Sequence, residues 1–139
     1  MLIIKHTITT NASVEAIWNI WQDIKNWHTW DNVTEYYSLD GPFQEGTKGV
    51  YKPKGGPLIQ VKLTQVEPLK IYAAECKLFL ARIISSHCLS TSNGKTQVTQ
   101  QIEIKGPLAF LFGYHLGNTL RKNLLVEMKS LIKKAESLG

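Results

Sequence analysis

The chain has 139 residues and a formal net charge of +5, and its 43% hydrophobic and 19% charged residues are ordinary for a folded soluble protein. This length predicts a single domain over residues 1–139 that buries roughly two-thirds of its chain surface. No run is apolar and long enough to span a membrane, and the N-terminus lacks the apolar core of a signal peptide. We therefore expect a cytoplasmic protein. The modest positive charge occurs without any nucleic-acid motif, which favours a solvated polar surface over a nucleic-acid partner.

The N-terminal segment predicts a strand followed by two short helices. Residues 2–10 alternate between apolar and polar, as a strand with one buried face does, and the alternation puts His6 on the inward face. Asn11 or Ser13 can cap the first helix, because a short polar side chain accepts hydrogen bonds from the free amides of the first turn. A second short helix is expected over residues 23–30.

Three further strands are expected over residues 33–40, 46–53 and 58–66. The loop between the last two closes in more than one way, so the register leaves open whether Val50 or Tyr51 points inward. Placing the neighbouring lysines in solvent would put Tyr51 inside.

The segment from Pro68 to Pro107 fixes its own strand register. Asn93-Gly94 suits the positive φ angles of a two-residue type I′ turn between two alternating runs. With this turn, apolar residues face apolar residues across the hairpin, as a buried face requires. The predicted pairs are Leu89 with Val98, His87 with Gln100, Ser85 with Ile102 and Ile83 with Ile104.

Turns at residues 78–81 and 67–70 extend the same inner face over two more strands. They place Tyr72 opposite His87, and they place Gln65 opposite Tyr72. The other predicted pairs are Val61 with Cys76, Leu63 with Ala74 and Cys76 with Ile83. The inner face is then apolar except for one polar row, which consists of Gln65, Tyr72, His87 and Gln100. A polar row on an apolar inner face indicates a ligand cavity.

The two cysteines are expected to be free thiols in a reducing compartment. The register separates Cys76 from Cys88 by roughly 15 Å at strand rise. A disulfide requires Cα atoms within about 7 Å of each other.

A long helix is predicted from Pro107 to the C-terminus. One stripe at helical spacing contains Leu116, Leu120, Leu124, Met128, Leu131 and Ala135. Residues 108–120 contain no Asp, Glu, Lys or Arg, so this half of the helix is expected to be buried. Gly113 and Gly117 leave three interpretations open: room for a ligand or a hinge, close approach of the helix to the sheet, or a break between two helices. The predicted fold class is α+β, with a curved seven-stranded antiparallel sheet wrapped around the long helix.

Several segments in order resemble the START-like, polyketide cyclase/dehydrase-like superfamily (SRPBCC, helix-grip fold). The matching segments are Thr10-Asn11-Ala12-Ser13-Val14-Glu15-Ala16-Ile17-Trp18, Trp27-His28-Thr29-Trp30-Asp31, Leu39-Asp40-Gly41-Pro42-Phe43, Gly46-Thr47-Lys48-Gly49, Val66-Glu67-Pro68 and Ile104-Lys105-Gly106-Pro107-Leu108. The resemblance covers nearly the whole chain and implies a cavity between the sheet and the C-terminal helix. The superfamily includes polyketide cyclases, lipid and hormone carriers, and chaperone activators. It has no universal catalytic set to carry over, so the resemblance does not fix an activity.

His87 and Tyr72 are the candidates for chemistry. An imidazole beside a phenol in an apolar pocket can move protons on a bound ketone or enol. In a second interpretation, the pair orients a bound ligand and transfers no proton. In a third interpretation, His87 is a buried histidine hydrogen-bonded to Tyr72 or Gln100. Trp27 and Trp30 are either the floor of a pocket mouth or core anchors, and His6 either approaches Gln100 or reaches solvent.

No metal or cofactor is expected. The histidines are scattered, and neither cysteine has a partner at zinc-site spacing. The chain contains no phosphate-binding, dinucleotide or nucleophile-elbow motif, and no acidic pair is expected on the inner face of the sheet.

The leading function is binding of a small, largely apolar ligand such as a lipid, a polyketide or another hydrophobic metabolite. The rivals are a cyclase or dehydratase that uses His87 and Tyr72, and a partner-binding module of the chaperone-activator type. A monomer or homodimer is expected, and transient membrane contact is left open. The expected ligand-binding residues are His6, Trp30, Tyr51, Val61, Leu63, Gln65, Tyr72, Ala74, Ser85, His87, Gln100, Ile102, Leu116, Leu120 and Leu124.

Overall fold

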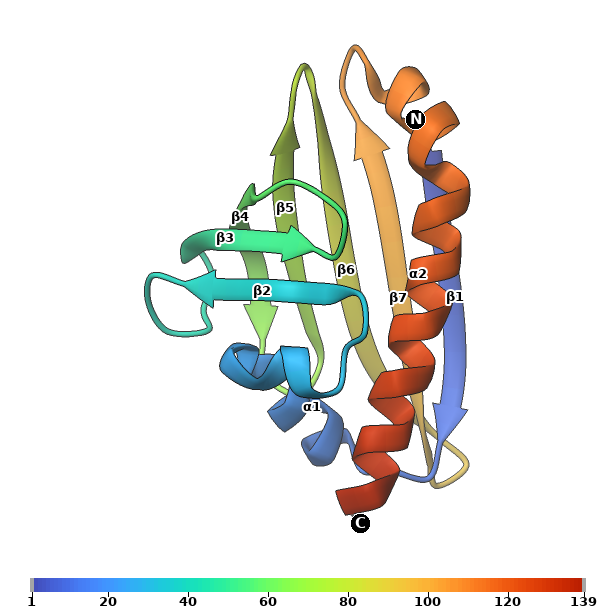
Figure 1. Ribbon diagram of the computed structural model, residues 1–139. Coiled ribbons are helices and arrows are strands. Elements are labelled where there is room, and N and C mark those ends of the chain that lie inside the picture. The colour runs from blue at the N-terminus through green and yellow to red at the C-terminus, as the bar shows by residue number, and fades with distance from the viewer. Residues whose placement is uncertain (1, 139) are drawn as a thin grey trace.

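The computed structural model describes residues 2–138 and shows a curled sheet beside one long helix (Figure 1). The helices are α1 (Val14–Gln22), the 3-10 helix η1 (Ile24–Thr29) and α2 (Ala109–Leu138). The strands are β1 (Leu2–Thr10), β2 (Thr34–Leu39), β3 (Lys48–Pro53), β4 (Ile59–Glu67), β5 (Ile71–Leu78), β6 (Ala81–Ser92) and β7 (Lys95–Lys105).

The seven strands form one antiparallel sheet in the order β1-β7-β6-β5-β4-β3-β2. Figure 1 shows β2 and β3 running across the direction of β5, β6 and β7, so the sheet curls around a concave face. Helix α2 lies along β1 and β7, and its C-terminal half also meets α1. This arrangement is the expected α+β helix-grip fold.

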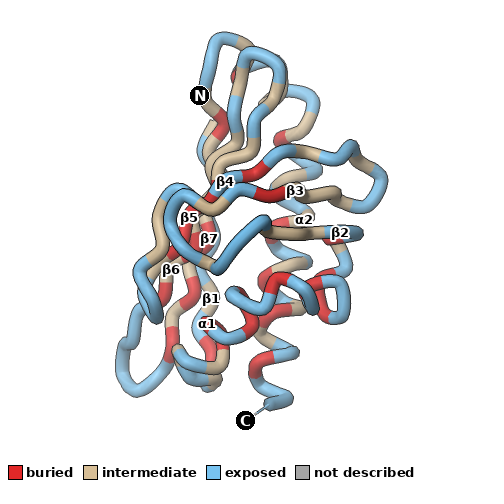
Figure 2. Tube along the Cα trace, turned by 90° about the vertical axis from the view of Figure 1, so that its left-hand side faces the viewer, coloured by how far each residue is buried: buried red, intermediate tan, exposed pale blue. Residues whose placement is uncertain are grey.

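Helix α1 begins at a polar cap and buries one face. The Ser13 Oγ accepts a hydrogen bond of 3.1 Å from the Ala16 amide, which satisfies a donor of the first turn. The buried side chains Ile17, Trp18 and Trp21 belong to the main core together with the C-terminal half of α2. Figure 2 shows buried residues concentrated around α1, the middle of the sheet and this half of α2, whereas the loops at the opposite end are exposed.

The register of β5, β6 and β7 is as predicted. Asn93 and Gly94 have φ angles of 53° and 77°, as a type I′ turn requires. Tyr72 pairs with His87, and His87 pairs with Gln100. The β1 register also puts His6 opposite Gln100.

The prediction for the second half of β4 is wrong by one residue. The pairs Val61–Cys76 and Leu63–Ala74 hold, but a β-bulge at Thr64 then shifts the strand, so that Gln65 pairs with Ala73 and Val66 pairs with Tyr72. A single extra residue moves every later side chain to the other face. Val66 therefore packs on the core, and the Gln65 amide donates a 2.8 Å hydrogen bond to the Glu67 carboxylate at an exposed site.

Helix α2 runs without a break past Gly113 and Gly117. A Cβ atom at either glycine would lie 3.4 Å from the Leu2 side chain, so the two glycines let the helix approach β1 closely. The predicted stripe is buried from Leu124 onward and half-buried at Leu116 and Leu120.

The expectation that the first half of α2 is buried is wrong. Phe110 and Tyr114 are 71% and 84% exposed, although the segment carries no charge. This end of the helix extends beyond the main core and covers only the edge of the sheet, so one of its apolar sides faces solvent (Figure 2).

Candidate functional site

A cavity of about 620 Å³ lies between the concave face of the sheet and α2. Its walls come from η1, strands β2 to β7, the β3–β4 loop and the α2 helix from Leu111 to Glu127. Most of the wall is apolar. The volume is within the range of ordinary small-molecule sites.

Several exposed side chains line the cavity, which shows where it opens. Lys54 and Pro57 belong to the β3–β4 loop, whereas Leu111, His115 and Thr119 belong to the first half of α2, and all five are exposed. The entrance therefore lies between this loop and this helix segment. The exposed Phe110 and Tyr114 flank it on the helix.

Most of the expected ligand-binding residues lie on the cavity wall, but not all of them do. The lining residues among them are Tyr51, Tyr72, Ala74, Ser85, His87, Ile102, Leu116, Leu120 and Leu124. The open question about β3 is thereby resolved, because Tyr51 points inward. The expected residues that do not line the cavity are His6, Trp30, Val61, Leu63, Gln65 and Gln100.

The structure explains why each of these six residues does not line the cavity. Val61, Leu63 and Trp30 are buried in the main core, and of the two tryptophans Trp27 lines the cavity instead of Trp30. Gln65 lies on the outer side of the bulge, as described above. His6 pairs with Gln100 but is exposed at the edge strand, and Gln100 is buried behind the wall.

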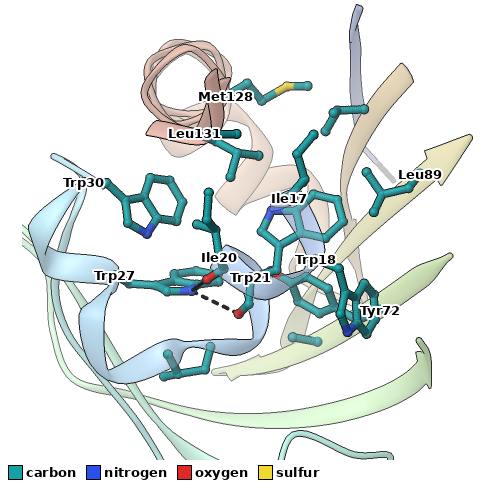
Figure 3. Close-up of a cluster of buried hydrophobic side chains, with 14 of the residues drawn as sticks. Ile17, Trp18, Ile20, Trp21, Trp27, Trp30, Tyr72, Leu89, Met128 and Leu131 are labelled. Atoms are coloured by element: carbon teal, nitrogen blue, oxygen red, sulfur yellow. Dashed lines mark hydrogen bonds between the residues drawn. The ribbon is translucent and has the colours of Figure 1, made fainter. Parts of the chain in front are cut away.

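The polar row is a stack of rings and not a hydrogen-bonded chain. The Tyr72 and His87 rings lie 4.1 Å apart and are nearly parallel, at 5°. The Trp21 ring meets each of them edge-on with centroids 5.3 Å away. Figure 3 shows Trp21 and Trp18 close to Tyr72. Stacking of this kind stabilises the three rings through their faces and edges and leaves their polar atoms free.

Apart from Gln65, every residue of this row has a buried side-chain polar atom without a hydrogen-bond partner within residues 2–138, and so does the neighbouring Trp21. The unpaired atoms are Trp21 Nε1, Tyr72 Oη, His87 Nδ1 and both side-chain polar atoms of Gln100. His87 Nδ1 therefore has no partner, whereas a hydrogen bond between the imidazole and the Tyr72 backbone agrees with the interpretation in which His87 bonds to Tyr72. The alternative bond to Gln100 is absent, because both side-chain polar atoms of Gln100 are unpaired within residues 2–138. Buried polar atoms normally have partners, and two of these residues, Tyr72 and His87, line the cavity.

Burial keeps both of these lining groups neutral. Desolvation lowers the pKa of His87 to about 3, only partly opposed by the Tyr72 backbone. Desolvation also raises the pKa of Tyr72 well above its usual value. At neutral pH the pair offers one phenolic donor and one imidazole that donates through one nitrogen and accepts through the other.

Sequence reasoning missed an acidic residue on the cavity wall. Glu127 of α2 lines the cavity and was not among the expected ligand-binding residues. Burial, followed by the charge of Asp31, raises its pKa well above the usual value. Glu127 follows the stripe residue Leu124 by three positions. This helical spacing was the only sequence signal that Glu127 lies on the same side of the helix as the stripe.

Tyr37 of β2 was also missed. It lines the cavity beside Trp27 of η1, one of the two tryptophans considered for a pocket mouth, with ring centroids 5.1 Å apart. Tyr51 lies on the other side of Tyr37 at 5.2 Å. The alternation of β2 predicts that Tyr36 and Tyr37 face opposite sides, but the sequence does not show which of them faces inward.

The curled sheet, the long helix and the cavity between them define a START-like helix-grip protein. The chain belongs to the polyketide cyclase / dehydrase and lipid transport family, whose model matches residues 1–136. No curated protein is similar enough to this sequence to count as a match.

Solved structures support the fold at low sequence identity. A hypothetical protein from Helicobacter pylori has a TM-score of 0.80 at 9% identity, over 96% of this chain and 88% of that chain. The Zhui aromatase/cyclase from Streptomyces sp. R1128 has a TM-score of 0.78 at 14% identity, over 97% of this chain and 93% of that chain. The di-domain aromatase/cyclase StfQ from the steffimycin pathway has a TM-score of 0.80 at 6% identity, over 97% of this chain and 50% of that chain. Identities this low establish a shared fold only.

Within residues 2–138, no helix combines the length and the apolar character needed to cross a membrane.

Proposed function

We propose that this protein binds a small, largely apolar ligand carrying one polar group in the cavity between the sheet and α2. The observation that carries the proposal is an open apolar cavity with the unpaired polar atoms of Tyr72 and His87 on its wall. An apolar pocket with a few placed polar groups is the usual form of a small-molecule site. A ligand hydroxyl or carbonyl between these side chains would supply the missing hydrogen bonds.

Filling the cavity tests the proposal. We expect wild-type protein to bind the neutral apolar dye N-phenyl-1-naphthylamine with a micromolar Kd, equivalent to about −8 kcal/mol. Leu120→Trp, which projects bulk into the cavity, should weaken binding about tenfold or more. Leu125→Trp is the matched control, because Leu125 is an exposed α2 residue that does not line the cavity. Unchanged affinity in a folded Leu120→Trp variant would place the dye elsewhere.

A cyclase or dehydratase that uses His87 and Tyr72 is the second candidate, favoured by the stacking of these two groups in the cavity. Their pKa values argue against it, because efficient proton transfer requires a pKa near the working pH. Desolvation moves both pKa values away from neutrality, in opposite directions.

Native mass spectrometry of freshly purified protein, followed by incubation of any bound compound, distinguishes the two functions. For a binding protein, His87→Gln should weaken retention by about 0.5–1.5 kcal/mol and change no bond in the compound. Turnover by wild type that falls about 100-fold in His87→Gln, with binding retained, would establish the enzyme instead.

A further inference from the structure

The end of the cavity near η1 contains an acidic pair. Glu127 of α2 is half-buried on the cavity wall. Asp31, which follows η1, is completely buried behind that wall, and its oxygens accept hydrogen bonds from the Val33 amide at 2.9 Å and the Thr34 hydroxyl at 2.6 Å. These bonds fix the Asp31 carboxyl in place. The negative charge of Asp31 is close enough to act on Glu127.

Aromatic rings line the same end. Trp27, Tyr37 and Tyr51 form a continuous series with centroid separations of 5.1 and 5.2 Å, and all three line the cavity. Trp27 is held rigidly, because its Nε1 donates to the carbonyls of Ile20 and Trp21 at 3.1 and 3.0 Å (Figure 3). Aromatic faces attract cations through their quadrupole.

The Tyr72 hydroxyl is an independent sign of a ligand at this site. Tyr72 is 1% exposed, lines the same cavity and has no hydrogen-bond partner among residues 2–138. The charge of Glu127 acts on Tyr72 as well as on Tyr37 and Tyr51, so all these groups surround one region. A phenolic oxygen can accept a hydrogen bond from the N–H of a protonated amine, whereas a quaternary ammonium group has no N–H and interacts with it only through its positive charge.

We infer that the cavity selects an apolar ligand that carries a basic amine or quaternary ammonium group. The cationic group lies against the aromatic wall of Trp27, Tyr37 and Tyr51, with Glu127 as its counter-ion. This inference rests on the proposed function and names its ligand class. A neutral ligand can form no ion pair with Glu127, and an anionic ligand would lie near the negative charge of Asp31.

Binding of a cation is then linked to release of a proton. The titratable groups that line the cavity with Glu127 are Tyr37, Tyr51, Lys54, Tyr72, Cys76, His87 and His115, and Asp31 lies behind the wall. Lys54 is the one lysine among them, and its charge acts on Asp31. Because burial and Asp31 raise the pKa of Glu127, the empty site favours the protonated acid. A permanent cation favours the carboxylate, so its affinity should rise with pH until Glu127 is already ionised in the empty site.

Three probes with the same apolar chain test the inference: decyltrimethylammonium, decan-1-ol and decanoate. Isothermal titration calorimetry of wild type should show the cation binding about tenfold more tightly than the alcohol, with the anion weakest. Glu127→Gln keeps the shape of the side chain and should remove the preference for the cation, so that the cation and the alcohol bind with similar affinity. Titrations in buffers of different ionisation heat should show proton release with the cation and none with the alcohol.

Glu45→Gln is the matched control, because Glu45 is an exposed loop residue that does not line the cavity, and it should keep the preference. Equal affinity for cation and alcohol in wild type would overturn the inference and leave the proposed function standing. A cation preference that survives Glu127→Gln would also overturn it. Failure of all three probes to bind would overturn the proposed function as well.

Discussion

The neutral imidazole of His87 makes folding stability depend on pH. Its pKa is lowered to about 3 by burial, whereas an unfolded histidine titrates near 6.5. Between these values the unfolded chain binds a proton that the folded chain does not, so stability falls as the pH drops below 6.5. From pH 7 to pH 5 this group should cost the folded state about 2 kcal/mol.

Urea unfolding of wild type and His87→Gln at the two pH values measures this contribution. The variant should lose about 2 kcal/mol less than wild type between pH 7 and pH 5. The raised pKa of Glu127 acts in the opposite direction, but it is present in both proteins and cancels. His28→Gln, at an exposed position, should keep the wild-type dependence. Equal pH dependence in wild type and His87→Gln would show that His87 is solvated in the folded state.

The hydroxyl of Tyr72 should matter more for binding than for folding. Because Tyr72 Oη is buried without a protein partner, Tyr72→Phe removes an unpaired polar atom and keeps the ring that stacks on His87. The free energy of unfolding should stay within about 0.5 kcal/mol of wild type or increase. Affinity for a ligand with a hydroxyl or carbonyl group should fall by about 0.5–1.5 kcal/mol.

Chemical unfolding and ligand titration of the same Tyr72→Phe preparation separate the two effects. A loss of stability larger than the loss of affinity would mean that the hydroxyl serves the fold and not the ligand.

The sequence predicts the central residues of the site and misses its acid for a definable reason. Tyr72 and His87 are found because strand alternation fixes the side on which each lies. Glu127 is missed because a charged residue beside an apolar stripe ordinarily lies in solvent. Its position in the cavity depends on how far α2 stands off the sheet at that turn. The cavity at that turn is also lined by Tyr37 and Tyr51, from strands distant in sequence, so no local pattern contains this separation.

Strand β4 contains one residue, Thr64, that pairs with no residue of β5. With Thr64 looped out, Leu63 and Gln65 pair with the consecutive residues Ala74 and Ala73. Deleting Thr64 therefore keeps every observed pair between β4 and β5. It removes the bend that a bulge provides and the 3.4 Å hydrogen bond that the Thr64 hydroxyl donates to the Ala73 carbonyl. We expect the deletion variant to fold with a cost of roughly 1–3 kcal/mol.

Deletion of Thr99 from β7 is the control. Thr99 lies in an uninterrupted register between two neighbouring strands, so its removal transfers half of the strand to the wrong face. Near-UV circular dichroism and urea unfolding should show a cooperative fold for the Thr64 deletion and none for the Thr99 deletion. If both deletions unfold the protein, the bulge is required for the curl of the sheet.

The same element shows the limit of register prediction. Asn93-Gly94 forms the turn of the hairpin between β6 and β7, so these two residues determine how both strands pair. The turn between β4 and β5 is also recognisable, since Pro68 and the positive φ of Leu69 suit a type II turn. A bulge four residues away has no such marker, because Leu63-Thr64-Gln65-Val66 is compatible with a regular strand.

For the whole molecule, ligand binding and folding should be linked. A ligand that binds only the folded state stabilises it by RT ln(1 + [L]/Kd), which is about 2.7 kcal/mol at a concentration 100 times the Kd. The apolar dye should therefore raise the midpoint of thermal unfolding of wild type in a concentration-dependent way. Leu120→Trp should show little of this shift, and Leu125→Trp should show all of it. A shift of equal size in both variants would mean that the dye binds outside the cavity.

The placement of β1 beside β7 has a consequence for the order in which the protein forms during synthesis. Leu2 pairs with Ile104, and Thr10 pairs with Thr96, so β1 has no neighbouring strand until β7, the last strand of the sheet in chain order, is made. At typical translation rates this interval is on the order of ten seconds. The wall that α2 supplies to the cavity is made later still. Shorter nascent chains therefore contain most of the sheet but no complete binding site, and a ligand can assist only the final stage of folding.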